Sequence, residues 1–366
     1  MKLIFTSYGK TSEYDQPKEW LKRIDAYTGI LEELAKQHEV ISIERINYEG
    51  EYLQGGVRYY FVKTKNKVAR FPFHTHKLIK AFKPRVVFIN GFIFPIQIIQ
   101  LRITLGRKPK IIILHRAEKP FTGLKKWFQK IADKCVDAYL FTSAEFGKEW
   151  IENGIISGPK KIYEVIQASS IFHPAERTSS RQALNVSGSP VFLWVGRLDE
   201  NKDPLTVVKG FICFLQSHPS AKLYMIYQLD KLLPELESIL DANAQARASI
   251  KLVGKISHEQ LQNWYNSADF IISGSHYEGS GVAVAEAMSC GCIPILTNIF
   301  SFRKMTGPAK CGLLYEAGND QELFETLLKT MEFDIAKERE KTLQQFHEEL
   351  SFEAISRKIN EVIESI

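Results

Sequence analysis

The chain has 366 residues, of which 45% are hydrophobic and 25% are charged, and its formal net charge is +6. This length and apolar content suit two globular domains. No apolar run reaches the roughly 20 residues of a membrane-spanning helix, and the run within residues 1–10 is too short for a signal peptide, so we expect a cytoplasmic protein. The five cysteines show no metal-ligand spacing and are expected to be reduced thiols.

The first half of the chain alternates short apolar runs with helical patterns, which predicts a doubly wound parallel sheet. The first predicted strand leads to Gly9, the third leads to Asn90 and Gly91, and the fourth ends at His115. Parallel strands present their carboxyl ends at one edge of a sheet, where such folds bind ligands. The predicted strands are residues 3–7, 38–46, 85–91, 110–115 and 138–143.

Basic residues are concentrated in this half, because residues 1–180 carry a net charge of +12 and residues 181–366 carry −6. Between Lys77 and Lys134 there are 14 basic and 2 acidic side chains, which predicts a positive surface and an anionic partner. The helix predicted at 121–134 has apolar side chains on one face and lysines beside them. The apolar side chains are Leu124, Trp127, Phe128 and Ile131, and the lysines are Lys125, Lys126, Lys130 and Lys134.

This helix is open to two interpretations. Apolar and basic faces side by side are typical of helices that lie on anionic membranes, which would place the protein on the inner face of a membrane as a peripheral protein. An ordinary helix that faces the core and has a solvated basic back gives the same pattern.

The segment 168–190 is rich in serine, proline and charge and lacks periodicity, which predicts a linker. Beyond it, a second alternation of strands and helices predicts another doubly wound domain. Its first strand, 191–195, is followed by Gly196, Arg197 and a polar loop that contains Lys202. Further strands are predicted at residues 222–227, 251–254, 269–274 and 293–297.

The most informative segment is 273–295, which reads SGSHYEGSGVAVAEAMSCGCIPI. A buried strand ends in a turn with Gly279 and Gly281 and continues as an apolar helix, whose first N–H groups and dipole suit a diphosphate. Glu278 lies in the turn and Glu286 in the helix, so the two carboxylates can accept hydrogen bonds from a ribose and a hexose of one extended ligand. The alternative, two solvated surface residues, is disfavoured by the apolar context of Glu286.

Arg197 and Lys202 would face the same diphosphate if both strands belong to one parallel sheet. Sugar transfer from a nucleotide sugar needs such cations, because the bond to the departing diphosphate breaks while positive charge develops on the sugar. The chain contains no Asp-any-Asp triplet to hold a metal ion, so we expect no metal and no other cofactor. An ordinary exposed loop is the alternative for Arg197 and Lys202.

In these motifs the chain resembles the retaining glycosyltransferases of family 4. The residues that carry the resemblance are GRLDENK, from Gly196 to Lys202, and EGSGVAVAEAMSCGCIPIL, from Glu278 to Leu296. The resemblance implies the GT-B fold, in which two Rossmann-like domains of doubly wound parallel sheet face each other across a cleft. It also implies metal-independent transfer of a hexose-type sugar, with retained configuration, from a nucleoside-diphosphate sugar to a glycan or lipid-linked acceptor.

The domain boundaries follow from the pattern of strands and helices together with this resemblance, and the residue roles follow from the resemblance. The domains are an acceptor-side domain at 1–168, a linker at 169–190, a nucleotide-sugar domain at 191–345 and a helix at 346–366 that returns to the first domain. Arg197 and Lys202 bind the diphosphate, Glu286 the ribose and Glu278 the hexose. His115 faces the transferred sugar, and Gly254 and Ile256 hold the base. The other donor-side residues are Gly9, Gly196, Gly279, Ser280, Gly281 and Val282. Asn90 and Gly91 lie on the acceptor side.

The sequence departs from the family in three places and leaves other functions open. The family's usual glycine-rich turn is replaced at residues 227–229, which read YQL. The family often has an aromatic residue at the position of Ser280 and paired glycines at the position of Gly9. A glycoside hydrolase could use Glu278 and Glu286 but offers no role for the two cations. A phosphorylase, an epimerase or a catalytically silent GT-B protein that binds a partner remains open. No nucleic-acid-binding motif is present, so no nucleic-acid partner is expected.

Overall fold

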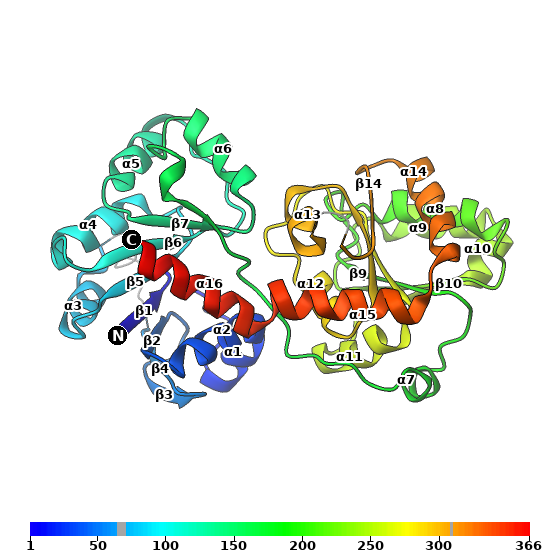
Figure 1. Cartoon of the computed structure of the whole chain (residues 1–366), viewed down its shortest axis with the longest axis horizontal. Coiled ribbons are helices and arrows are strands. Elements are labelled where there is room, and N and C mark those ends of the chain that lie inside the picture. The colour runs from blue at the N-terminus through cyan, green and yellow to red at the C-terminus, as the bar shows by residue number, and fades with distance from the viewer. Residues whose placement is uncertain (64–70, 308–309) are drawn as a thin grey trace. The chain divides into compact units, whose positions relative to one another are not determined.

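The computed structural model describes residues 1–63, 71–307 and 310–366, which divide into two compact units. The first unit is Met1–Ser169 together with Phe352–Ile366, and the second is Ser170–Ser351. Both are α/β units built around a largely parallel sheet, as the sequence predicts (Figure 1). The segment 169–190 falls almost wholly within the second unit, and 346–366 is divided between the two.

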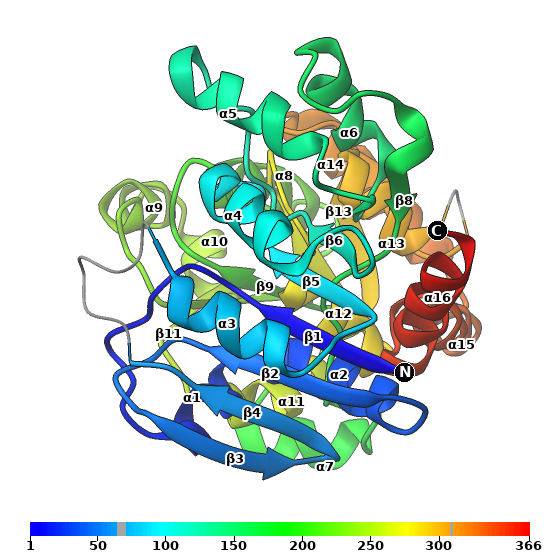
Figure 2. The same ribbon diagram turned by 90° about the vertical axis from the view of Figure 1, so that its left-hand side faces the viewer.

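The sheet of the first unit has eight strands in the order β3-β4-β2-β1-β5-β6-β7-β8. Neighbouring strands run parallel, except that β3 and β4 form an antiparallel hairpin at one edge (Figure 2). The central strands are buried on both faces, which explains their unbroken apolar sequences. The strands are β1 (Lys2–Thr6), β2 (Glu39–Glu44), β3 (Gly50–Gln54), β4 (Val57–Phe61), β5 (Val86–Asn90), β6 (Lys110–Leu114), β7 (Ala138–Phe141) and β8 (Ile162–Glu164).

Helices cover both faces of this sheet (Figures 1 and 2). One of them, α16, comes from the far end of the chain and packs on α2. The contact is close, because a Cβ atom added to Gly29 would lie 2.6 Å from the ring of Phe352. The helices of this unit are α1 (Pro17–Arg23), α2 (Asp25–Ala35), α3 (Phe73–Ala81), α4 (Pro95–Leu105), α5 (Gly123–Asp133), α6 (Ala144–Glu152) and α16 (Phe352–Ser365).

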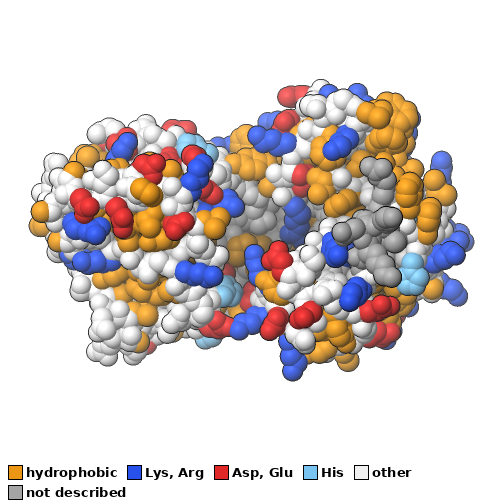
Figure 3. Space-filling model, turned by 180° about the vertical axis from the view of Figure 1, so that it is seen from behind, with side chains coloured by type: hydrophobic (Ala, Val, Ile, Leu, Met, Phe, Trp, Pro, Cys, Tyr) orange, Lys and Arg blue, Asp and Glu red, His pale blue; other side chains and the backbone are white. Residues whose placement is uncertain are grey.

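The helix α5 directs part of its apolar side to solvent. It buries Gln129, Ala132 and Asp133, whereas Leu124 and Trp127 are 72% and 54% exposed. On the face shown in Figure 3, hydrophobic side chains gather in the upper part of this unit with lysine and arginine side chains beside them. Of the described helices, none is long and apolar enough to cross a membrane. The lysines Lys125, Lys130 and Lys134 are exposed, and Phe128 and Ile131 are half-buried.

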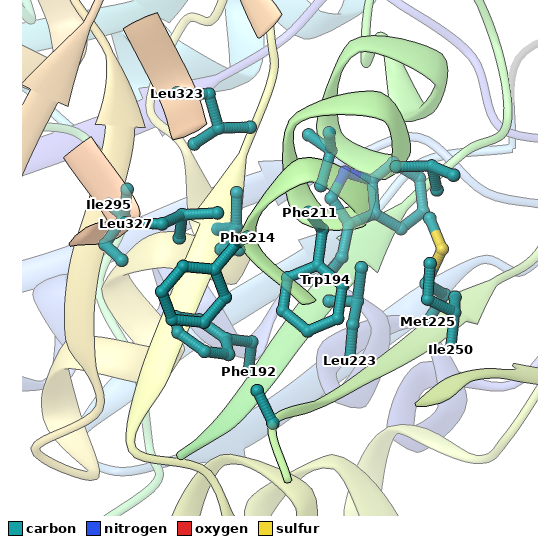
Figure 4. Packing of buried hydrophobic residues seen from close by; sticks show 14 of the residues in the cluster. Phe192, Trp194, Phe211, Phe214, Leu223, Met225, Ile250, Ile295, Leu323 and Leu327 are labelled. Atoms are coloured by element: carbon teal, nitrogen blue, oxygen red, sulfur yellow. The ribbon is translucent and has the colours of Figure 1, made fainter. Parts of the chain in front are cut away.

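The second unit has a sheet of six parallel strands in the order β11-β10-β9-β12-β13-β14. On one of its faces, Phe192 of β9 stacks on Phe270 of β12 at 5.0 Å between ring centroids. Phe192 also meets Phe211 of α8 edge-on, with 5.4 Å between ring centroids (Figure 4). This aromatic packing fixes α8 over β9. The strands are β9 (Val191–Gly196), β10 (Lys222–Tyr227), β11 (Ile250–Gly254), β12 (Phe270–Ser273), β13 (Ile293–Thr297) and β14 (Leu313–Tyr315).

The predicted linker contains a helix, α7, that is tied to this sheet. Glu176 caps the helix by accepting hydrogen bonds from two backbone N–H groups of its first turn. Arg177 and Arg181 donate to the buried Asp269 carboxylate at 2.6 and 2.9 Å. The sequence interpretation missed α7 because charged side chains, rather than an apolar stripe, anchor it. The helices of this unit are α7 (Arg177–Leu184), α8 (Pro204–Leu215), α9 (Leu233–Asp241), α10 (Ala244–Ser249), α11 (His258–Ser267), α12 (Val282–Ser289), α13 (Phe300–Thr306), α14 (Asp320–Lys329) and α15 (Ile335–Gln345).

Candidate active site

The strand order of the second unit reverses between β9 and β12, which are parallel neighbours. In open α/β sheets a ligand-binding crevice forms at such a reversal, outside the carboxyl ends of the strands. The loop 197–203 follows β9 and the loop 274–281 follows β12. The fold therefore brings the two motifs found in the sequence, one with Arg197 and Lys202 and the other with Glu278, to one edge of one sheet.

Hydrogen bonds hold these two loops against each other. The side chain of Asn201 donates through Nδ2 to the backbone carbonyl of Tyr277 at 3.0 Å. The backbone carbonyl of Asn201 accepts from the backbone N–H of His276 at 2.8 Å. The His276 ring also lies 3.1 Å from a carboxylate oxygen of Asp203. Gly274 permits this approach, because a Cβ there would lie 2.7 Å from the Asp203 carbonyl. The sequence interpretation singled out none of these three polar contacts.

Within the loops, Lys202 and Glu278 form an ion pair between the ammonium and a carboxylate oxygen. Their side chains are only 21% and 14% exposed, so the pair is partly screened from water. Arg197 is 52% exposed and pairs through Nε with Asp199 at 2.9 Å. Lys202 is thus half-buried beside Glu278, the residue predicted to bind the hexose, while Arg197 reaches solvent.

The helix α12 begins directly after the second loop. Its N-cap is Gly281, whose φ of +54° and close approach to Met305, 2.9 Å from an added Cβ, favour glycine. Among the described residues no side chain caps α12, so its first N–H groups and the positive end of its dipole are left for solvent or a ligand. Gly279 and Ser280 are half-buried before it, and Val282 is 40% exposed.

Glu286 lies one turn further along α12 and is only 4% exposed. One carboxylate oxygen accepts a hydrogen bond from Nε2 of His258 at 2.6 Å, and the other accepts from the hydroxyl of Tyr265 at 2.9 Å. Burial and the nearby carboxylate raise the pKa of Tyr265 well above its usual range, so this hydroxyl remains a donor. Both partners come from α11, and the sequence interpretation missed them.

The turn between β11 and α11 carries Gly254 and Ile256, which the sequence predicts to hold the base. Gly254 has a φ of +83°, a conformation that glycine adopts readily. Ile256 packs against a buried cluster that includes Phe172 and Tyr265. The turn leads straight into His258, so it is linked through that side chain to Glu286.

The remaining predicted residues belong to the first unit, where β1 and β5 flank the reversal of strand order. Gly9 follows β1, and its N–H donates to the Ser7 hydroxyl at 3.1 Å. Asn90 ends β5 and accepts from Arg116 Nη2 at 2.7 Å, and Gly91 follows it with a φ of +83°. The fold thus places Asn90 and Gly91 at the carboxyl end of β5, beside the reversal of strand order, and their acceptor role stays a prediction.

His115 follows β6 in the same unit and is 5% exposed. Its Nε2 donates to the Glu118 carbonyl at 2.9 Å, and its Nδ1 faces the backbone N–H of Ala117 at 3.4 Å. Burial lowers the pKa of His115, which favours the neutral ring that this pairing requires. Both nitrogens therefore serve the 115–118 turn, and contact with a sugar stays a prediction.

Comparison with known proteins identifies related sequences. Residues 176–349 match the family model described as glycosyl transferases group 1. GDP-mannose:cellobiosyl-diphosphopolyprenol alpha-mannosyltransferase from Xanthomonas oryzae pv. oryzae is 24% identical, over 78% of this chain and 71% of that protein. D-inositol 3-phosphate glycosyltransferase from Pseudarthrobacter chlorophenolicus is 26% identical, over 43% of this chain and 39% of that protein.

Solved structures share the fold over the whole chain. HepE from Anabaena, in complex with UDP, aligns with a TM-score of 0.74 at 14% identity and covers 100% of both chains. A glycosyltransferase from Rickettsia africae also aligns with a TM-score of 0.74, at 17% identity, over 100% of this chain and 98% of that one. These likenesses confirm the predicted GT-B fold class.

Proposed function

Residues 176–349 belong to the glycosyl transferases group 1, and from this we propose that the chain transfers a hexose-type sugar from a nucleoside-diphosphate sugar to a glycan or lipid-linked acceptor. The observation that carries the proposal is the reversal of strand order in the second unit. There Lys202, Glu278 and the uncapped N-terminus of α12 converge on the carboxyl edge of two neighbouring strands.

In the proposed donor complex each group has a distinct partner. Lys202, Arg197 and the first N–H groups of α12 bind the diphosphate, since all three present positive charge or donors. Glu278 accepts hydrogen bonds from the hexose, and Glu286 accepts them from the ribose. The turn at Gly254 and Ile256 holds the base.

We propose that transfer retains the anomeric configuration and needs no metal ion. The acceptor hydroxyl attacks from the side of the diphosphate, whose oxygen takes the proton as the bond to the sugar carbon breaks. Arg197, Lys202 and the helix N-terminus then stabilise the departing negative charge. Nuclear magnetic resonance of the product tests this step, because an inverted anomeric configuration contradicts it.

The relatives suggest which substrates to try first. The Xanthomonas relative is named for a GDP-mannose donor and a diphosphopolyprenol-linked acceptor, and the Anabaena structure holds UDP. We propose a lipid-linked acceptor for this chain by analogy with the first. For the donor, UDP-, GDP- and ADP-sugars all enter the test.

Thermal unfolding in the presence of these nucleotide sugars tests the proposal. One base class is expected to raise the melting temperature, since a ligand at a hundred times its Kd contributes about 2.7 kcal/mol to the stability of the folded state. Glu286→Ala should reduce the shift, measured against the melting temperature of the same variant without ligand. Glu237→Ala, an exposed change on α9, should keep it.

Two outcomes would redirect the interpretation. If no nucleotide sugar stabilises the protein, the proposed function is wrong. If a nucleotide sugar binds but no acceptor is glycosylated, a catalytically silent protein of the same fold becomes the better interpretation.

We also propose that the chain binds the inner face of an anionic membrane through α5 and the basic segment from Lys77 to Lys134. The exposed side chains of Leu124 and Trp127 would enter the lipid surface, and each nearby lysine would contribute about 1 kcal/mol. Charge complementarity supports this partner, because the segment has 14 basic and 2 acidic side chains.

Cosedimentation with lipid vesicles is expected to show this binding. The protein should sediment with vesicles of phosphatidylcholine and phosphatidylglycerol but not with vesicles of phosphatidylcholine alone. Added salt should weaken the binding. Leu124→Ser with Trp127→Ser should abolish it. Leu53→Ser is the matched control, because Leu53 is 71% exposed on β3 of the same unit. Equal binding by the double variant would contradict the role of α5.

A further inference from the structure

The carboxylate of Glu286 is held at both oxygens by side chains of α11. His258, the first residue of that helix, lies with Nε2 2.6 Å from one oxygen, and the hydroxyl of Tyr265 lies 2.9 Å from the other. An ionised carboxylate can accept hydrogen bonds but cannot donate them, so Nε2 of His258 must carry the proton in this contact. The two donors therefore fix the plane of the carboxylate.

This arrangement leaves the carboxylate able to bind more donors. Each carboxylate oxygen offers about two acceptor positions, and the described partners occupy one on each. About one acceptor position per oxygen therefore remains for the donors of a ligand. Two neighbouring hydroxyls of one sugar ring, such as those of a ribose, match such a pair.

The two partners differ in how they can affect a ligand. Tyr265 is completely buried and belongs to the core of the unit. The side chain of His258 is 35% exposed, and one face of its ring lies against Phe172 at 4.9 Å between centroids. His258 also follows directly on the turn of Gly254 and Ile256 that is proposed to hold the base.

The start of α11 is itself fixed, which makes this histidine a rigid support. The backbone N–H of Ser257 donates to Oε1 of Gln260 at 3.0 Å, a contact typical of a capped helix N-terminus. The imidazole thus connects a fixed turn to a buried carboxylate on a different helix.

We propose that His258 is a positioning residue for the ribose: it orients Glu286 so that the carboxylate accepts both ribose hydroxyls, and it thereby sets the preference for ribonucleotides over 2′-deoxyribonucleotides. The proposal rests on the proposed function, because it takes Glu286 as the ribose ligand. It adds a residue that touches the ligand only through Glu286.

Calorimetric titration with UDP, GDP and ADP and with their 2′-deoxy forms tests the proposal on the full chain. Wild-type protein should bind the ribonucleotide of its preferred base at least about tenfold more tightly than the 2′-deoxy form, a difference of about one hydrogen bond. His258→Phe keeps a ring against Phe172 but removes the donor, so the preference should fall to less than about threefold. Affinity for the 2′-deoxy form should fall less, because only its 3′-hydroxyl can bind Glu286.

Two further variants separate positioning from a general loss of structure. His258→Gln has an N–H that can reach the carboxylate, so it should restore part of the ribose preference. Asn263→Ala changes an exposed residue of the same helix and should behave as wild type.

The outcomes distinguish this inference from the function on which it rests. If no nucleotide binds to the wild type, the proposed function fails. If nucleotides bind but His258→Phe keeps the full ribose preference, or if the wild type shows none, the positioning role is overturned. If His258→Phe lowers the affinity for the ribonucleotide and for its 2′-deoxy form equally, and His258→Gln does not restore the ribose preference, then the histidine has a structural role only. That result would overturn the proposal as well.

Discussion

Replacing Lys202 with alanine is expected to slow sugar transfer by about 30- to 1000-fold, which corresponds to about 2–4 kcal/mol of transition-state stabilisation. Negative charge accumulates on the diphosphate as its bond to the sugar breaks, and the Lys202 ammonium lies at the sheet edge where this diphosphate is proposed to bind. In the free protein the same ammonium contacts the Glu278 carboxylate. The variant therefore loses a cation and also leaves Glu278 as an uncompensated anion.

The measurement is a single-turnover rate with the nucleotide sugar that stabilises the protein. Arg197→Ala should cost less, about tenfold, because the Arg197 side chain is 52% exposed and its charge is screened by water. Lys209→Ala, an exposed change on α8, is the matched control and should leave the rate unchanged. A chelator should also leave the wild-type rate unchanged if these cations replace a metal. Unchanged turnover in both Lys202→Ala and Arg197→Ala would exclude the assignment.

The part of the site that the sequence predicts is the part that follows from strand order. Long apolar runs such as 191–196 and 269–274 identify buried parallel strands without any knowledge of their partners. Once both strands belong to one parallel sheet, their carboxyl ends must share an edge. The meeting of Lys202 with Glu278, 76 residues later in the chain, is a consequence of that topology.

The contacts that complete the site have no comparable pattern in the sequence from which they could be predicted. The pairs His258 with Glu286 and His276 with Asp203 join polar side chains from separate loops and helices, and no periodicity in the sequence marks such partners. The sequence interpretation also missed the hairpin of β3 and β4, although the sequence contains a local pattern that predicts it. Gly55 and Gly56 occupy its turn with φ values of +57° and +78°, the conformation that a two-residue hairpin loop requires.

Replacing Glu278 with glutamine is expected to move nucleotide binding and sugar transfer in opposite directions. The carboxylate is only 14% exposed and neutralises Lys202 in the free protein. A nucleoside diphosphate without a sugar must displace it from Lys202 and then lie beside an unpaired anion. Glutamine removes that repulsion, so the diphosphate should bind severalfold more tightly. Transfer should slow by about 100-fold, since an uncharged amide loses the stronger, charge-assisted hydrogen bonds to the hexose.

Calorimetry with the nucleoside diphosphate and the single-turnover rate supply the two readings, with Glu237→Gln on α9 as the control of equal charge change. The opposite signs are the diagnostic feature. A substitution that damages the loop would weaken binding and slow transfer together, and a solvated glutamate would change neither. Tighter nucleotide binding with slower transfer is expected only if Glu278 pairs with Lys202 in the free protein and binds the sugar once the diphosphate occupies Lys202. By the same reasoning, Glu278→Gln added to Lys202→Ala should recover part of the lost nucleotide affinity, because the anion left behind by the first change is gone.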